Sequence, residues 1–160
     1  STNEQISTKL ELNSITSGLI KNVSECSDQA FASLAMGKGI VIEPTDNIIY
    51  APCDCTVNFV FPSKHAIGLV TKINSQSILI HVGIDTVNLN GEGFEILKEE
   101  GKVKKGEPLM KIDLEYLRSH APSLVSPVIC TELGENQKIR LLKEGDIQSG
   151  EDLFAIDIYE

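Results

Sequence analysis

The sequence contains no tryptophan, and aromatic residues make up only 5% of its 160 residues. No apolar run approaches the roughly 18–20 residues of a membrane-spanning helix, and the N-terminal region lacks the pattern of a signal peptide. Basic residues are few, with 14 Lys and Arg against 23 Asp and Glu, which gives a net charge of −9. This balance argues against binding to nucleic acids or to anionic membranes. It favours basic partners, unless the charge only keeps the protein in solution.

Familiar cofactor motifs are also missing. The chain has no Walker loop, no dinucleotide glycine pattern and no His-Glu-x-x-His, so nothing indicates a nucleotide cofactor. Four cysteines are present, of which only Cys53 and Cys55 are close in sequence, while Cys26 and Cys130 stand alone. Two residues apart on a strand, Cys53 and Cys55 would share one face. A zinc site would need a further pair, so we expect four reduced thiols in a cytoplasmic protein.

The distribution of apolar residues predicts an all-β fold. Residues 1–15 are polar and are predicted to form a flexible leader with a short helical turn over residues 7–12, whereas residues 16–160 are expected to form a single domain. Short segments rich in β-branched residues, broken by Gly, Pro, Asn and Asp, predict strands at 39–42, 57–61, 67–73, 77–84, 109–112, 125–129 and 153–158. The best helix candidate, 114–120, is short and is followed by Pro122. The pattern favours an antiparallel β-sandwich or barrel with short helical turns.

An internal repeat is visible in the second half of the chain. Residues 100–113 align with residues 144–157 at a constant offset of 44. Each copy reads as a glycine turn, a β-branched residue, a second glycine turn and an alternating strand. We therefore expect two similar hairpin units packed face to face.

Two of the three histidines, His65 and His81, fall in or beside apolar predicted strands. Either residue could be an ordinary buried or surface histidine, but imidazole also serves as nucleophile, acid, base or metal ligand near neutral pH. Strand alternation places His81 opposite to Ile78, Ile80 and Val82, and the glycine at 83 would leave space beside its ring.

The spacing of the two histidines predicts a hairpin. A turn centred on Ile73 would bring His65 directly opposite His81, whereas Asn74-Ser75-Gln76 indicates a turn slightly later. A bulge is one way to reconcile the two, and the sequence leaves the register open.

The sequence segments around the histidines resemble those of a known protein family. The segment His81-Val-Gly-Ile-Asp-Thr-Val, the upstream Ser63-Lys-His65-Ala and the earlier Gly37-Lys-Gly-Ile-Val-Ile-Glu-Pro44 resemble the glucose-type IIA proteins of the bacterial sugar phosphotransferase system. The resemblance covers roughly residues 15–158. One departure is Asp54-Cys55-Thr56, where the family often has Asp-Gly-Thr, so that a turn glycine is missing.

The resemblance implies a phosphocarrier. His81 would accept a phosphoryl group from the histidine-containing phosphocarrier protein and pass it to a cysteine of a IIB domain for sugar uptake and phosphorylation. His65 would stabilise the phosphoryl group, and Ser63 stands where the family usually has a threonine hydroxyl near the phosphate.

The resemblance also implies a docking surface for protein partners. It assigns Phe31, Phe61 and Val87 to an apolar ring around the histidines, with Gly83 and Asp85 beside it, although core burial is the default expectation for any one of these apolar residues. Asp85 would either cap Thr86 locally or form an anionic rim that meets an arginine of the donor. The third histidine, His120, is expected at the surface or at a helix end.

Two alternatives remain at this point. The domain could be a regulatory IIA-like part of a sugar permease, or a free regulator, whose phosphorylation tunes transport. No resident cofactor is expected, although His65 and His81 could share a zinc ion with a carboxylate of a partner. The protein is expected in the cytoplasm, free or tethered to a permease, without inserting into the membrane. The sugar is not indicated.

Overall fold

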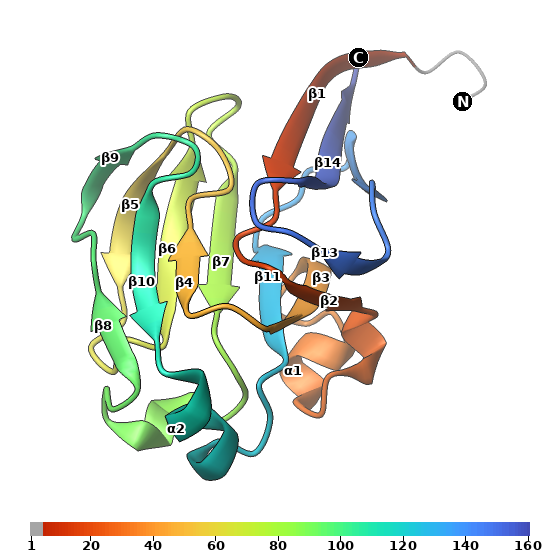
Figure 1. Ribbon diagram of the computed structural model, residues 1–160. Coiled ribbons are helices and arrows are strands. Elements are labelled where there is room, and N and C mark those ends of the chain that lie inside the picture. Colours follow the sequence, from red (N-terminus) through yellow and green to blue (C-terminus); the bar gives the residue numbers. More distant parts are fainter. Residues whose placement is uncertain (1–4) are drawn as a thin grey trace.

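The computed structural model describes residues 5–160 and consists mainly of antiparallel strands in three sheets (Figure 1). The large sheet has eight strands, in the order β13 (Gly145–Ile147), β2 (Gly18–Lys21), β3 (Lys38–Pro44), β11 (Ser126–Cys130), β7 (Ser77–His81), β6 (Ala66–Thr71), β5 (Cys55–Val60) and β9 (Gly101–Val103). One small sheet has the order β1 (Ile6–Asn13), β14 (Asp152–Tyr159) and β12 (Gln137–Leu141). The other has the order β4 (Ile48–Tyr50), β10 (Pro108–Ile112) and β8 (Phe94–Ile96). The predicted all-β fold with antiparallel sheets is confirmed.

Helices are short and lie in the connections. They are η1 (Val23–Glu25), α1 (Gln29–Ala32), η2 (Thr86–Leu89) and α2 (Leu114–His120). The helix predicted at 114–120 is confirmed as α2, whose N-cap Asp113 accepts a 3.0 Å hydrogen bond from the backbone N–H of Tyr116. Between residues 5 and 160, no helix is long and apolar enough to cross a membrane.

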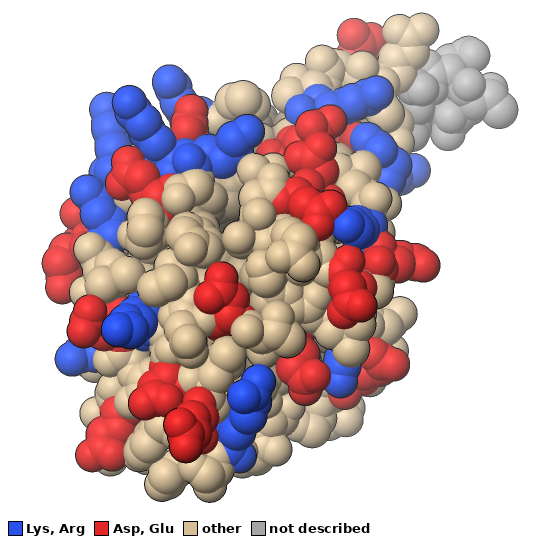
Figure 2. All heavy atoms as spheres, in the orientation of Figure 1, with Lys and Arg blue, Asp and Glu red and all other residues tan. Residues whose placement is uncertain are grey.

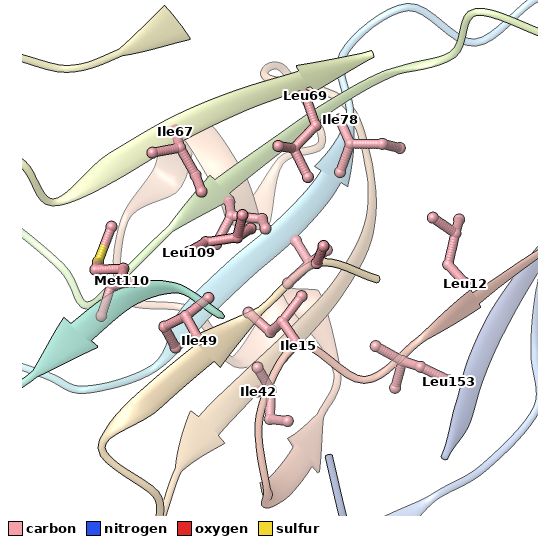
Figure 3. Packing of buried hydrophobic residues seen from close by; sticks show 14 of the residues in the cluster. Leu12, Ile15, Ile42, Ile49, Ile67, Leu69, Ile78, Leu109, Met110 and Leu153 are labelled. Atoms are coloured by element: carbon pink, nitrogen blue, oxygen red, sulfur yellow. The ribbon is translucent and has the colours of Figure 1, made fainter. Parts of the chain in front are cut away.

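The main core lies between one face of the large sheet and the two small sheets. Figure 3 shows Ile67, Leu69 and Ile78 of the large sheet facing Leu109 and Met110 of β10. A second, smaller cluster lies on the opposite face of the large sheet, beneath α1, and comprises Cys26, Phe31, Val41, Ala66, Leu79, Ile84, Val125 and Ile129. Burial on both faces explains why the strands read as continuous apolar runs.

The N-terminal segment is a strand, so the prediction of a flexible leader over residues 1–15, with a helical turn at 7–12, is wrong for residues 6–15. β1 pairs with β14, and Leu12 and Ile15 are fully buried. The segment is polar overall because Lys9 and Glu11 alternate with the buried side chains. Its partner strand lies at the other end of the chain, where local composition cannot reveal it. Residues 1–4 of the expected leader lie outside the described residues.

The internal repeat has the predicted strand–turn–strand form, but it does not make hairpins. Its copies are β9 with β10 and β13 with β14, and the two strands of each copy belong to different sheets. Each strand pairs instead with an earlier segment: β9 with β5, β10 with β4, β13 with β2 and β14 with β1.

The earlier segments meet in a symmetric exchange of backbone hydrogen bonds. Asn13 donates to the carbonyl of Pro52 (2.9 Å), and Tyr50 donates to the carbonyl of Ile15 (2.7 Å). These two backbone hydrogen bonds join the segment that ends β1 to the segment that ends β4, and the two copies of the repeat lie around them.

Candidate functional site

The histidines lie at one end of the β6–β7 hairpin. Ala66, the first residue of β6, pairs with His81, the last residue of β7, and the backbone N–H of Val82 donates a 2.9 Å hydrogen bond to the carbonyl of His65. The turn is therefore centred half a residue later than Ile73, without a bulge. His65 is one position away from facing His81 directly, but it precedes the regular strand, and its ring turns toward that of His81.

The imidazole rings of His65 and His81 are close together on the side of the smaller cluster. Their centroids are 4.8 Å apart, with an angle of 82° between the ring planes. His65 is buried, with 3% of its surface exposed, whereas His81 is partly exposed. Phe61 contacts the His65 ring (5.5 Å) and Phe31 contacts the His81 ring (5.1 Å). The two rings thus form an edge-to-face pair held between phenylalanines.

The tautomer of His81 follows from its backbone partner. Its Nδ1 lies 2.8 Å from the carbonyl oxygen of Gly83. A carbonyl can only accept a hydrogen bond, so Nδ1 carries the proton and donates it. Nε2 is left with a free lone pair, which is the form that a nucleophilic imidazole needs.

The turn after β7 holds this carbonyl in place. The N–H of Gly83 donates to Ser126 Oγ (3.0 Å), which donates to the carbonyl of Leu124 (2.8 Å). Thr86 Oγ1 donates to the carbonyl of Val82 (2.6 Å). Ser126 and Thr86 are both fully buried. Sequence reasoning missed both residues, because their partners depend on the tertiary fold.

The role expected for Gly83 needs correction. Gly83 is buried, so it offers no surface to a partner, and it does not open a space beside the imidazole. Its φ is +74°, and a Cβ there would lie 2.7 Å from Thr86 Cγ2 and 3.1 Å from the carbonyl of Ser123. Glycine is required by the left-handed turn and by this close packing.

The glycine noted as missing at Cys55 is not needed. Cys55 is the first residue of β5, is buried, and is not among the residues with positive φ.

Ser63 lies beside the other histidine. Its Oγ is 2.7 Å from His65 Nδ1. When the hydroxyl donates this hydrogen bond, the proton of the neutral His65 is on Nε2. Ser63 therefore contacts the imidazole that was expected to stabilise the phosphoryl group.

Both imidazoles are neutral at physiological pH. Burial, with a smaller contribution from the nearby His81, lowers the pKa of His65 from 6.5 to about 4. Burial also lowers the pKa of His81, opposed by the Gly83 carbonyl and by the carboxylates of Asp28 and Asp85. The low-dielectric surroundings thus keep the lone pair of His81 Nε2 available.

Two carboxylates lie near His81. Asp85 is exposed with a left-handed backbone (φ 56°), and its side chain makes no capping hydrogen bond to η2, so the local-cap reading is not supported. Asp28 accepts a 2.9 Å hydrogen bond from the N–H of Ala30 at the start of α1. Sequence reasoning missed Asp28, although an Asp before a helical Gln-Ala-Phe is an N-cap signal.

The expected apolar ring differs in exposure from residue to residue. Val87 is 51% exposed and Phe61 is partly buried, but Phe31 is only 4% exposed. Phe59 was not expected here, yet it is 47% exposed and its ring lies 4.9 Å from that of Phe61. Phe31 therefore packs against His81 and offers little contact area, whereas Phe59 and Val87 offer more.

The remaining candidate groups are possible metal ligands, the cysteines and the third histidine. No group of three or more His, Cys, Asp or Glu side chains suited to a metal occurs in residues 5–160. The four cysteines are buried and free of disulfides. His120 is exposed at the end of α2 and stacks on Tyr116 at 3.9 Å, as expected for a helix-end residue.

Comparisons with known proteins identify the family of this chain. Residues 10–136 match the family described as phosphoenolpyruvate-dependent sugar phosphotransferase system, EIIA 1. The chain is 43% identical over 137 residues to the PTS system glucoside-specific EIICBA component of Staphylococcus carnosus, covering 85% of this chain and 20% of that protein. It therefore spans about a fifth of the length of that relative.

A solved structure has the same fold. The glucose permease IIA from Mycoplasma capricolum superimposes with a TM-score of 0.87 at 31% identity, covering 93% of this chain and 96% of that chain. The chain belongs to the glucose-type EIIA family of the phosphoenolpyruvate-dependent sugar phosphotransferase system.

Proposed function

We propose that this protein is a phosphocarrier that is transiently phosphorylated on His81. One observation carries the proposal: His81 Nδ1 is held by the Gly83 carbonyl at 2.8 Å while the ring of His65 lies 4.8 Å from that of His81. Nε2 of His81 is thereby set up as a nucleophile, with a second imidazole beside the position of an incoming phosphoryl group.

In the first half-reaction the lone pair of His81 Nε2 attacks phosphorus. The P–N bond to the histidine of the phosphocarrier protein breaks, its electron pair returns to the donor imidazole, and a P–N bond to His81 forms. The proton stays on His81 Nδ1 throughout, hydrogen-bonded to the Gly83 carbonyl. His65 Nε2–H donates to a phosphoryl oxygen and spreads its negative charge.

In the second half-reaction a cysteine thiolate of a IIB domain attacks phosphorus. A P–S bond forms, the P–N bond breaks, and His81 returns to its neutral form. Ser63 orients His65 through its hydroxyl. We place the protein in the cytoplasm, acting beside or tethered to a sugar permease, and propose no resident cofactor.

The docking surface for both partners includes Phe59, Phe61 and Val87 around the histidines. Asp28 and Asp85 supply negative charge at its rim, which suits a phosphocarrier partner that is basic around its own histidine.

The test is phosphoryl transfer from labelled phosphoenolpyruvate through enzyme I and the phosphocarrier protein. His81→Gln should take up no label, whereas His65→Gln should become labelled and pass the group on slowly or not at all. His120→Gln is the matched control, because it removes an exposed histidine outside the site, and it should behave as the wild type. Stable label on His81→Gln would contradict the assignment.

The same assay separates a carrier from a regulator. Label that reaches wild-type protein but never reaches a IIB cysteine would show that phosphorylation regulates and does not supply the sugar. Stoichiometric zinc bound by the isolated protein and lost in both histidine variants would contradict the absence of a resident cofactor.

A further inference from the structure

A group of lysines gathers at the end of the large sheet away from the histidines. The five side chains are Lys9, Lys72, Lys102, Lys104 and Lys105, all exposed, and they line two adjoining hollows that share Lys72 and Asp54. Figure 2 shows the basic side chains crowded over the tips of β5, β6 and β9, in a surface that is otherwise mixed or acidic. We call these five residues the lysine patch. It holds five of the 14 basic residues of a chain whose net charge is −9.

The lysine patch carries a positive net charge, because its five lysines outnumber the three carboxylates that line the same hollows, Glu11, Asp54 and Glu107. None of its five ammonium groups is in an ion pair within residues 5–160. Two of these three carboxylates bind backbone: Asp54 accepts from the N–H of Lys105 (2.9 Å), and Glu107 accepts from the N–H of Lys104 (3.1 Å). These hydrogen bonds fix the loop, and the ammonium groups remain directed to solvent.

An exposed apolar side chain lies within the lysine patch. Ile73 follows Lys72 in the β6–β7 turn and is 55% exposed, the highest value among the exposed large hydrophobic residues of the described chain. The turn is rigid, because Thr71 Oγ1 donates to the carbonyl of Ile73 (2.6 Å) and accepts from the N–H of Gln76 (2.8 Å). A rigid turn presents Ile73 outward among ammonium groups.

The composition of the patch discriminates between kinds of partner. Protein interfaces are enriched in Arg and large aromatic residues and depleted in Lys. The lysine patch contains only Lys, which makes few directional contacts but attracts anionic surfaces over distance. An isoleucine among lysines matches a surface that is negative outside and apolar beneath, as in a bilayer of anionic lipids.

We infer that the lysine patch is a binding surface for anionic phospholipid headgroups, with Ile73 entering the interface between them. The inference rests on the proposed function, in which the protein works beside a membrane permease. Lys72 follows the last residue of β6 and His65 precedes its first, so the two sites are separated by a strand about 20 Å long. A domain docked through the lysine patch keeps its histidines directed away from the membrane and accessible to partners.

The net charge of −9 does not oppose this arrangement. Exposed charges separated by more than about 10 Å are largely screened at moderate ionic strength. A surface that touches the lysine patch therefore experiences mainly the local net charge, which is positive because five lysines face three carboxylates. Composition predicts that anionic membranes repel this protein, but that prediction uses only the net charge. It does not take into account that the fold gathers five lysines in one place.

The test is co-sedimentation of the purified protein with two kinds of vesicle. One is pure phosphatidylcholine, and in the other about a third of the lipid is phosphatidylglycerol. Wild-type protein should bind only the anionic vesicles, and raising the salt should release it. The triple substitution Lys72→Glu, Lys102→Glu and Lys104→Glu should weaken binding by about tenfold or more.

A matched control carries the same change in net charge elsewhere. Lys38→Glu, Lys111→Glu and Arg118→Glu are exposed positions outside the lysine patch, and this variant should bind as tightly as the wild type. Ile73→Ser should weaken binding severalfold without changing its salt dependence. Circular dichroism checks that each variant is folded.

Three results would overturn the inference: equal binding to neutral vesicles, equal loss in both triple variants, or no binding to anionic vesicles. If detergent-solubilised permease captures wild-type protein but not the patch variant, while anionic vesicles capture neither, the lysine patch serves a protein partner. Phosphoryl uptake by the wild-type protein in the same buffer tests the proposed function separately.

Discussion

The backbone N–H of Val82 donates a 2.9 Å hydrogen bond to the carbonyl oxygen of His65. This bond extends the β6–β7 pairing by one residue. It places Val82, which follows His81, against His65. The relative position of the two imidazoles is therefore set by the hairpin backbone. We expect substitution of either ring to leave the other in place, which is the condition for reading single variants separately.

Removal of the Ser126 hydroxyl should disturb His81 without touching it. In Ser126→Ala the buried N–H of Gly83 loses its acceptor, at a cost of about 1–3 kcal/mol, and the Gly83 carbonyl is less well held. We expect phosphoryl uptake to slow about tenfold, because even a small displacement of a positioned nucleophile lowers the rate of attack. The pKa of His81, followed by NMR, should fall further, since the Gly83 hydrogen bond raises it.

Ser119→Ala is the control for this variant. Ser119 is exposed on α2, away from the histidines, and its loss should change neither the uptake rate nor the titration of His81. An unchanged rate and an unchanged pKa in Ser126→Ala would show that the turn holds its shape without this hydroxyl.

The free energy of unfolding should decrease as the pH is lowered, over a range set by the pKa of His65. Its folded-state pKa of about 4 lies below the ordinary value of 6.5, so the unfolded chain binds the proton first as the pH falls. The contribution of neutral His65 is fully present above pH 6.5 and is lost as the pH falls toward 4. Between about pH 7 and about pH 5 the loss from this residue should be about 2 kcal/mol.

Urea unfolding of wild type, His65→Gln and His120→Gln at both pH values measures this contribution. Carboxylates also titrate in this range, so the relevant quantity is the difference between variants. His65→Gln should lose part of the pH dependence that His120→Gln retains. Identical pH dependence in all three proteins would mean that His65 does not carry it.

The charge of Asp85 should matter for encounter with the phosphocarrier protein. Asp85→Asn removes the charge and keeps a residue that tolerates the left-handed backbone at φ 56°. We expect slower phosphoryl uptake at low salt, a smaller difference at high salt, and an unchanged melting temperature. Stopped-flow transfer at two ionic strengths measures the effect, with Asp146→Asn, an exposed position on β13, as control.

If Asp85→Asn and Asp146→Asn have the same rates at both ionic strengths, then Asp85 only occupies the turn. A proportional loss at both ionic strengths would indicate a direct contact with the partner and not steering.

The N-terminal strand should contribute strongly to stability. Leu12→Ala removes a fully buried side chain and should lower the free energy of unfolding by about 3 kcal/mol. Ile6→Ala, in the same strand but 38% exposed, should cost much less. Denaturant unfolding compares the two variants. Equal, small effects would restore the interpretation of this segment as a dispensable leader.

Local patterns predicted seven of the fourteen strands in the described part of the chain, and the histidine pair. The alternation in β7 correctly placed Ile78, Ile80 and Val82 together on one face, which is the face of the main core, and His81 on the other. The β6–β7 hairpin was predicted because its strands are neighbours in sequence, but its register was left open between a turn at Ile73 and a slightly later one. The carbonyl that fixes His81 was predictable for the same reason, since it lies only two residues away.

Long-range relationships were not predictable from one sequence. β1 was not recognised as a strand because its partner β14 lies about 150 residues away, and nothing near β1 in the sequence shows that one of its faces is buried. The repeat was read as hairpins because nothing local shows that its strands pair with β1, β2, β4 and β5. Ser126 reaches Gly83 across the sheet, and the lysine patch combines residues from three separate segments. Net charge, as a single number, hides such a patch.

The pairing of β1 with β14 has a consequence for synthesis on the ribosome. Ile6 pairs with Tyr159, and β14 lies between β1 and β12, so the sheet that covers Leu10 and Leu12 cannot close until the last strand has emerged. Pairings of such long separation form slowly, because the loop between them must be ordered first. The β6–β7 hairpin, whose strands are joined by a short turn, has no such delay. The nascent chain is therefore expected to form its histidine hairpin early and to expose apolar residues of β1 until β14 has emerged.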